Sequence, residues 1–466
     1  MKAKDFLGIT VLTPHIQNEG VADTLDRIVK AGATAVAVNT SVVAPSAEGE
    51  GSFQPPTDAG SSPRLLERKL WGKDALWLRS GPGHAANRDL FANSPYKPRE
   101  PNDLTLSDGP IIGELIAEAK ARGLKVFIQT SATAPPGLHD DDTPRLPDGR
   151  IPSNRMAATG CLASPAVRTY NRAWVQDIFA QYPQLDGIRP DWPEYPCYKL
   201  DEAFQDFNPH VKSWADEHGF DFESIRRDVL VFYDYIHGEL TNNDLAAFAT
   251  AERSQFAILD FYNQFPGVAE WFRLKAALSS GLLRDWKDAI TTFGGPDKEL
   301  SANAFILPFS YVTGLSPALA AKSCDSISVK LYAMHWSLMV EFWASALLKA
   351  NPNLSETAVV PALVNLLDLA NPDEGGTTIA DYGYPKPDEP HPIALSVQGR
   401  KLEQAVSAAR GQTKVNALVH GYGPLEDFKQ RFEVALKSSV NGIWINRYGY
   451  LGDTKLEAIR ELWAKR

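Results

Sequence analysis

The stretch VADTLDRIVKAGATAVAVNTS, residues 21 to 41, holds a helix pattern that runs directly into a strand pattern. Its first residues place apolar side chains three or four positions apart, and a glycine stands where a helix would end. The run ATAVAVNTS (33 to 41) that follows is almost continuously apolar, as expected of a strand covered on both faces. The stretch GPIIGELIAEAKARG, followed by LKVFIQTSA (124 to 132), repeats the unit.

Six further runs of the same kind bring the predicted strands to eight. They are FLGITVLTP (6 to 14), LDGIRPDWP (185 to 193), NAFILPFSY (303 to 311), SISVKLYAM (326 to 334), VNALVHGYG (415 to 423) and NGIWINRYG (441 to 449). Helical patterns lie between the strands, which favours a parallel sheet. The sequence therefore predicts an α/β fold, a (β/α)8 barrel.

Three connections are longer than a barrel needs. Residues 42 to 108 are rich in Pro, Gly and Ser and predict an irregular loop. Residues 194 to 302 contain amphipathic stretches such as WFRLKAALSSGLLRDWKDAI, which predict a largely helical subdomain. Residues 371 to 395 are predicted as a third loop. We expect one barrel domain over residues 1 to 466, with the first two insertions walling a pocket at the carboxyl ends of the strands.

Composition excludes several classes of protein. The 466 residues carry a net charge of −10, and 44% hydrophobic and 22% charged residues are ordinary globular values. No basic excess indicates nucleic-acid binding, and no run approaches the ~18 apolar residues of a membrane span. The three cysteines are too far apart for a CxxC metal site, and the N-terminus lacks a secretion signal. We expect a cytoplasmic protein without nucleic-acid or membrane partners, its oligomeric state left open.

The strongest local signal is DGIRPDWPEY, residues 186 to 195. Pro190 lacks the N–H that a sheet needs, so it marks the strand's end and turns Asp191 onto the rim. Arg189 lies two residues earlier and points to the same side in an extended chain. We expect the guanidinium to keep Asp191 ionised, and a purely structural ion pair is the alternative.

With the two helix–strand stretches above and a long loop ending in YKP, the run YPQLDGIRPDW resembles TIM-barrel glycoside hydrolases of the α-amylase-like and "hypothetical glycosyl hydrolase" type. In such enzymes the fourth strand ends in Arg-x-Asp, whose aspartate is the catalytic nucleophile, and Arg189 and Asp191 match. The resemblance also implies a glutamate acid after strand five and a His–Asp pair at strand seven. Here FILPFSYVTG has no glutamate, and His420 has no adjoining aspartate.

The identity of a second catalytic carboxyl therefore stays open. Glu194 is the first candidate, because two acids in one site have separated pKa values and divide into an acid and a base. Glu194 could equally bind a sugar hydroxyl or cap a helix. Loop acids are the alternatives: Asp140 to Asp142, Asp381 or Asp453. Carboxyls about 5 to 5.5 Å apart would retain the anomeric configuration, and about 6.5 to 9.5 Å would invert it.

Polar and aromatic side chains gather at the predicted strand ends. A sugar needs donors and acceptors for its hydroxyls and an aromatic face for its C–H side. Trp192, Trp336 and Tyr422 are candidates for that face. The predicted substrate-binding residues are His15, Asn39, Gln129, Arg189, Trp192, Lys330, Tyr332, His335, Trp336, His420, Tyr422, Asn446 and Arg447.

Lys330 and the histidines allow other chemistry. Lys330 either pairs with Asp191 across the mouth, stabilises an enolate or forms a Schiff base. His15, His335 and His420 with Asp191 are a candidate divalent-ion site, although no HxH or HExxH spacing supports it. We expect no metal and no other cofactor.

The leading prediction is a carbohydrate-active enzyme, a glycoside hydrolase that cleaves a small glycoside, with Asp191 as nucleophile or base and Glu194 as its partner. One alternative is a sugar lyase, epimerase or isomerase that uses Lys330, Tyr332 or a histidine as base. Another is a sugar-binding barrel without catalysis.

Overall fold

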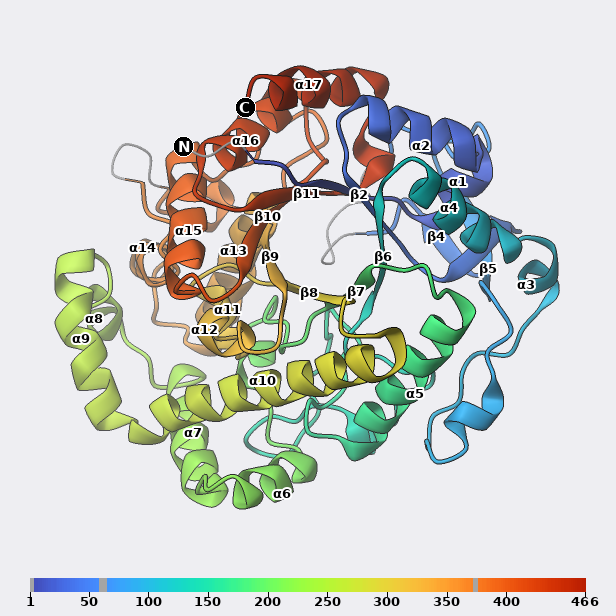
Figure 1. The fold of residues 1–466 in the computed structure, drawn as a ribbon. Coiled ribbons are helices and arrows are strands. Elements are labelled where there is room, and N and C mark those ends of the chain that lie inside the picture. The colour runs from blue at the N-terminus through green and yellow to red at the C-terminus, as the bar shows by residue number, and fades with distance from the viewer. Residues whose placement is uncertain (1–3, 58–64, 372–375) are drawn as a thin grey trace.

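Eight parallel strands close into a barrel in the computed structural model, which describes residues 4–57, 65–371 and 376–466. In order around the barrel they are β1 (Leu7–Thr10), β2 (Ala35–Val38), β6 (Lys125–Ser131), β7 (Gly187–Asp191), β8 (Glu299–Ala304), β9 (Ser326–Leu331), β10 (Lys414–His420) and β11 (Gly442–Asn446). Strand β11 pairs with β1, Ile443 lying opposite Leu7, and closes the ring (Figure 1). The predicted (β/α)8 barrel is confirmed.

The fifth strand lies earlier than predicted. The expected strand at 303 to 311 is wrong over most of its length, because β8 ends at Ala304 and helix α11 (Phe309–Thr313) follows. Pro308 at the start of this helix has no N–H for a sheet. The strand itself reads ELSANA, in which Leu300, Ala302 and Ala304 are buried and alternate with Ser301 and Asn303. Its small and polar residues concealed it from a pattern based on β-branched runs.

The helices around the barrel begin and end at the expected signals. In α2 (Val21–Lys30) the residues Val21, Leu25 and Ile28 are buried, at helical spacing. Helix α4 (Pro110–Ala121) begins with proline, whose missing N–H costs nothing in a first turn. Helix α5 (Pro165–Gln181) is capped by Ser164, whose hydroxyl accepts a hydrogen bond from Val167 N at 3.1 Å.

The other helices connect the strands or extend the connections. They are α1 (Thr13–Glu19), α3 (Asp103–Ser107), α6 (Pro209–Glu217), α7 (Phe222–Ile236), α8 (Asn242–Ala246), α9 (Ala251–Gln264), α10 (Pro266–Gly294), α12 (Pro317–Ala320), α13 (Ala333–Ala350), α14 (Glu356–Leu366), α15 (Leu395–Ala408), α16 (Leu425–Lys437) and α17 (Asp453–Ala464). Short 3-10 helices are η1 (Arg88–Phe91), η2 (Asp140–Asp142), η3 (Asp201–Phe204), η4 (Ile379–Asp381) and η5 (Tyr448–Tyr450). None of these described helices has the length and hydropathy of a transmembrane span.

The two long insertions contain different structures. Residues 42 to 108, expected to be irregular, carry a three-stranded antiparallel sheet of β3 (Ser41–Pro45), β4 (Ser52–Gln54) and β5 (Leu76–Pro82), with β5 in the middle. Residues 194 to 302 hold α6 to α10, as the helical pattern predicts. Helix α10 packs along α5 on the outside of the barrel, and α8 and α9 stand at the edge of the molecule (Figure 1). Residues 58–64 and 372–375, in the predicted loops, lie outside the described residues.

The barrel interior has its own apolar cluster, separate from the larger core beneath the helices. It consists of Ala35, Ala37, Phe127, Tyr332, Met334, Leu418 and Trp444. A Cβ at Gly8 would lie 2.2 Å from the Trp444 ring, so the close approach of β1 to this ring requires glycine. This cluster forms the floor beneath the polar side chains at the carboxyl ends of the strands.

Candidate functional site

Asp191 and Lys330 form an ion pair at the carboxyl ends of β7 and β9, with 2.8 Å between Oδ1 and Nζ. Because the strands are parallel, both residues reach the same mouth of the barrel. The Trp192 and Phe305 rings lie 4.8 and 4.9 Å from Nζ and flank the ammonium. The pairing of Lys330 with Asp191 considered from the sequence is confirmed.

Asp191 keeps part of its surface open. Its side chain is 24% exposed, whereas that of Lys330 is 4% exposed. Oδ1 also accepts a hydrogen bond from Trp192 N at 3.2 Å. Oδ2 has no hydrogen-bond partner among the described residues. The carboxylate therefore has one oxygen held by the protein and one available to a ligand.

Arg189 lies beneath this pair and does not form the expected ion pair with Asp191. It is fully buried, its Nη2 donates to Asn303 Oδ1 at 2.7 Å, and its guanidinium stacks 3.5 Å from the Trp444 ring centre. Burial lowers the pKa of Arg189 to about 9, against the charge of Asp191, which raises it. Lys330 takes the role expected of Arg189, which is direct pairing with Asp191. It reaches Asp191 from β9, two strands from β7 in the barrel.

Glu194 is sealed inside the loop that follows β7. Its Oε1 accepts a hydrogen bond from Phe305 N at 2.6 Å, and its Oε2 accepts one from the Thr313 hydroxyl. Burial raises the pKa of Glu194 to about 7, which the Thr313 hydrogen bond and the Lys330 charge oppose. Both oxygens are thus bound to the segment after β8.

Tyrosine, histidine and asparagine side chains line the side of the mouth opposite β7. Asn446 Nδ2 donates to Tyr332 Oη at 2.7 Å, and the Tyr332 ring meets those of His335 and His420 edge-on at 5.3 and 4.9 Å. His335 Nδ1 lies 3.3 Å from the hydroxyl of Tyr198. The structure brings together these residues from β10, β11, the start of α13 and the loop after β7.

His15 and Arg447 occupy the β1–β11 side. His15 is buried, and burial together with the charges of Arg447 and Arg68 lowers its pKa to about 3, so the ring is neutral. Asn39 is used structurally, since its Oδ1 accepts from the backbone N–H of Thr13 at 3.1 Å and from the Thr13 hydroxyl at 2.9 Å. Arg447 follows β11 and is half-buried.

Other predicted residues are used within the protein. Trp336 is 1% exposed and packs in the core beneath the helices, so its ring is not presented to a ligand. Tyr422 donates its hydroxyl to Pro385 O at 3.1 Å. Both rings are buried against other side chains of the protein. Trp192 is therefore the remaining candidate for stacking on a sugar.

The loop acids also have structural partners. Asp142 accepts a hydrogen bond from Tyr96 Oη at 2.5 Å, and Asp381 accepts from Thr378 N at 2.9 Å at the start of η4. Asp453 pairs with Arg68 at 2.6 Å on the surface. None of these three is bonded to a residue of the mouth among the described residues.

Many buried polar atoms at the mouth have no hydrogen-bond partner in the described parts of the chain. They are Thr10 Oγ1, His15 Nδ1, Gln129 Oε1, Ser131 Oγ, Arg189 Nε and Nη1, Trp192 Nε1, Ser328 Oγ and Arg447 Nε. Buried polar groups are normally paired with protein or ordered water. Their gathering in one place provides donors and acceptors for a polar ligand or for water.

Sequence reasoning missed Thr10, Ser131, Asn303 and Ser328. Each lies on an inward face of a barrel strand, and two of them stand two residues from a predicted site residue, Ser131 from Gln129 and Ser328 from Lys330. For Ser131 and Ser328, this spacing of two residues was the signal that could have found them. In the described residues, no three His, Cys, Asp or Glu side chains are grouped as a metal site would require.

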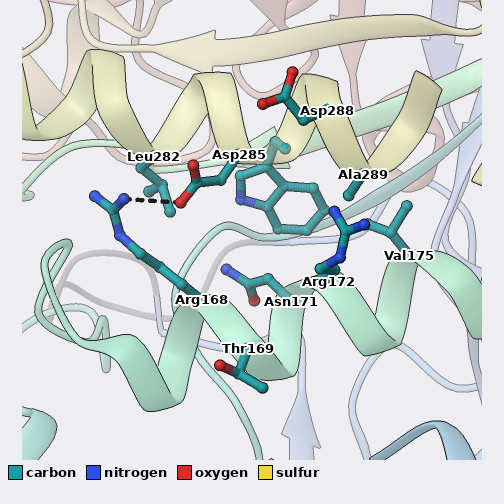
Figure 2. A pocket seen from close by; sticks show the side chains of 10 residues that line it. Arg168, Thr169, Asn171, Arg172, Val175, Leu282, Asp285, Asp288 and Ala289 are labelled. Atoms are coloured by element: carbon teal, nitrogen blue, oxygen red, sulfur yellow. Dashed lines mark hydrogen bonds and ion pairs between the residues drawn. The ribbon is translucent and has the colours of Figure 1, made fainter. Parts of the chain in front are cut away.

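Two hollows lie away from the mouth. One, of about 250 Å³, lies between α5 and α10, where Arg168 and Asp285 pair at 2.8 Å (Figure 2). The other, of about 990 Å³, lies among α7, α9, α10 and α14 and is lined mainly by aromatic and aliphatic side chains. Neither is lined by a predicted site residue.

Comparison with known proteins gives matches only in structure. No family model matches the chain, and no curated protein matches it in sequence. The chain is similar to a β-galactosidase from the psychrophilic Marinomonas ef1, with TM-score 0.53 and 10% identity over 99% of this chain and 59% of that one. The fold is one that glycoside hydrolases use. The chain is also matched to the catalytic domain of a β-amylase from Paenibacillus polymyxa, with TM-score 0.47 and 11% identity over 99% and 98% of the two chains.

The likeness to the β-galactosidase is a likeness of fold. At 10% identity the galactosidase match confirms the expected resemblance to glycoside-hydrolase barrels in architecture, and this chain spans 59% of that galactosidase. What the chain does must therefore be argued from its own residues.

Proposed function

We propose that this chain is a glycoside hydrolase that cleaves a small glycoside at the barrel mouth, with Asp191 as nucleophile or base. The observation that carries the proposal is the pair of Asp191 with Lys330 at the carboxyl ends of the strands, the face that holds the active site in barrel enzymes. The partnerless polar atoms around the pair suit the hydroxyls of a sugar.

In this proposal Asp191 acts through Oδ2 on the anomeric centre. It either attacks the anomeric carbon to form a glycosyl ester, which water then hydrolyses, or takes a proton from the water that attacks. In both routes a solvent water protonates the departing oxygen. Lys330 fixes the orientation of the carboxylate through Oδ1. Gln129 and Asn446 bind hydroxyls, and Trp192 covers the C–H side of the ring.

Glu194 has a supporting role in this proposal. Because it is fully buried and both its oxygens accept hydrogen bonds from the segment after β8, it holds the loop that carries Trp192 rather than protonating a leaving group. It is therefore a positioning residue.

The position of Glu194 also favours a second candidate. Without a second open carboxyl beside Asp191 among the described residues, a sugar lyase, epimerase or isomerase would use Lys330, Tyr332 or a histidine as its base. A sugar-binding barrel without catalysis is the third outcome.

Product analysis separates the candidates. The protein is incubated with a panel of aryl glycosides and oligosaccharides, and the products are identified by NMR. A free sugar and a released alcohol support the hydrolase, and an unsaturated or rearranged sugar supports the lyase or isomerase. Saturable binding without any product would contradict both enzymatic functions.

A further inference from the structure

Among the described residues, cations outnumber acids at the mouth of the barrel, although the whole chain has a net charge of −10. Three cations, Arg189, Lys330 and Arg447, lie at the ends of β7, β9 and β11. The described acids at the mouth are Asp191 and Glu194, and Lys330 pairs with Asp191. Arg189 and Arg447 form no ion pair with a described carboxylate.

Arg189 differs from the other buried cations of the described chain. Arg431 pairs with Asp427 at 2.7 Å, Lys455 pairs with Glu67, and Lys275 and Lys401 donate to backbone carbonyl oxygens. The acceptor of Arg189 is the neutral amide of Asn303, and its Nε and Nη1 have no acceptor in the described residues. Lys275 also lacks an anion, but its ammonium is satisfied by carbonyl oxygens, whereas the unused donors of Arg189 are costly and indicate a further polar partner.

Arg447 is the cation that a ligand can reach. It is half-buried at the rim, its Nε has no hydrogen-bond partner, and no described carboxylate forms an ion pair with it. The neighbouring acid Glu19 is already engaged, since it accepts hydrogen bonds from Arg27 at 2.6 Å and from the Tyr448 hydroxyl at 2.8 Å. His15, close enough for Arg447 to influence its charge, also has a partnerless Nδ1.

We propose that the sugar bound at the barrel mouth is an acidic sugar, a uronic acid or its glycoside, and that Arg447 binds its carboxylate. A planar guanidinium matches a carboxylate through two parallel hydrogen bonds. Arg189 supplies a second positive charge from below. The inference rests on the proposed function in one respect: it takes the sugar to bind beside Asp191.

Binding measurements test the inference without requiring turnover. Isothermal titration of the full chain compares glucuronate and galacturonate with glucose and galactose, and includes glucose 6-phosphate as a phosphate arm. We expect the uronates to bind roughly tenfold or more tightly than the neutral sugars, as one charge-assisted hydrogen-bond pair allows. The preference should shrink as salt is added, because salt screens charges at a partly exposed site.

Variants assign the preference to one residue. Arg447→Gln should bring the uronates to the affinity of the neutral sugars, and Arg447→Lys should retain part of the preference because it keeps the charge and loses the paired geometry. The control is Arg273→Gln on the outside of α10, where Arg273 is 70% exposed and pairs with Glu270. This control should bind uronates as the wild type does.

The outcomes distinguish this inference from the proposed hydrolase. Equal affinity for acidic and neutral sugars in the wild type, a preference that survives in Arg447→Gln, or tighter binding of the phosphate sugar would each overturn the acidic-sugar inference. Turnover of neutral glycosides without uronate preference would leave the hydrolase standing and remove the inference. Selective uronate binding without hydrolysis would support the acidic-sugar inference and contradict the proposed hydrolase.

Discussion

The buried carboxyl of Glu194 links stability to pH. Its pKa is raised to about 7 from the ordinary 4.5, because burial disfavours the charged form. Thr313 approaches both Glu194 and Ser310 O but has a single hydroxyl hydrogen. The hydrogen bond from Thr313 opposes the rise of the Glu194 pKa but does not cancel the effect of burial. The native state therefore keeps a proton that the unfolded chain releases above about pH 4.5.

We expect this contribution to stability to be present in full below about pH 4.5 and to be lost as pH rises to about 7. Relative to Glu194→Gln, whose amide does not titrate, the wild type should lose on the order of 3 kcal/mol of unfolding free energy across that range. Urea unfolding of both proteins at several pH values measures the difference. Parallel profiles for the two proteins would show that Glu194 is ionised in the native state.

At the scale of single residues, the sequence indicated which chemical groups lie at the mouth better than it indicated which residues contact one another. The proline that ends a strand located Asp191 at the mouth, and its neighbours in the barrel proved polar as expected. The partner of Asp191 depends on how the strands are placed around the barrel, so the sequence offered both Arg189 and Lys330, and the structure has Lys330, two strands away. Burial of Glu194 and Trp336 depends on how loops and helices pack, which no local pattern reveals.

At the scale of elements, the approach of β1 to Trp444 gives a sharp test. A Cβ at Gly8 would lie 2.2 Å from the ring, and the ring is held by Phe127 and Arg189. Gly8→Ala should therefore lower the unfolding free energy by about 1–3 kcal/mol or more, as overpacking does. Thermal unfolding measures the loss.

The matched control is a glycine with free space around it. Gly113 lies within α4, and a Cβ there meets no atom within 4 Å. Gly113→Ala should leave stability unchanged or raise it by up to about 1 kcal/mol, since alanine is the better helix former. Equal effects of the two substitutions would contradict the packing that we describe inside the barrel.

Strands were predictable where both faces are covered by apolar neighbours. In runs such as Ala35–Val38 and Gly442–Asn446, the largely apolar composition indicates burial on both faces. Strand β8 does not, because its inward positions are Ser301 and Asn303 and its apolar positions include two alanines. The small sheet in residues 42 to 108 escaped prediction because its strands are short and largely exposed, with pairing set by contacts distant in sequence.

At the scale of the whole molecule, the loop after β7 bears on the size of the substrate. It contacts helix α13, where Tyr198 meets His335, and Trp343 Nε1 holds this loop by donating to Cys197 O and Tyr198 O at 3.1 and 3.2 Å. The polar atoms beneath are buried. We expect kcat/KM to be highest for substrates of one or two sugar rings and to fall with chain length. A length series of oligosaccharides measures this, and faster turnover of polysaccharides would contradict it.

The most direct test of the account is the turnover number of Asp191→Asn. The substitution keeps the shape of the side chain and removes its charge, so folding should be preserved while kcat falls by roughly 10³ or more, since the change removes transition-state stabilisation. Asp453→Asn is the control, because Asp453 is 85% exposed and pairs with Arg68 on the surface. The account predicts a folded but nearly inactive Asp191→Asn beside a fully active Asp453→Asn. A folded Asp191→Asn with near-native kcat would contradict it.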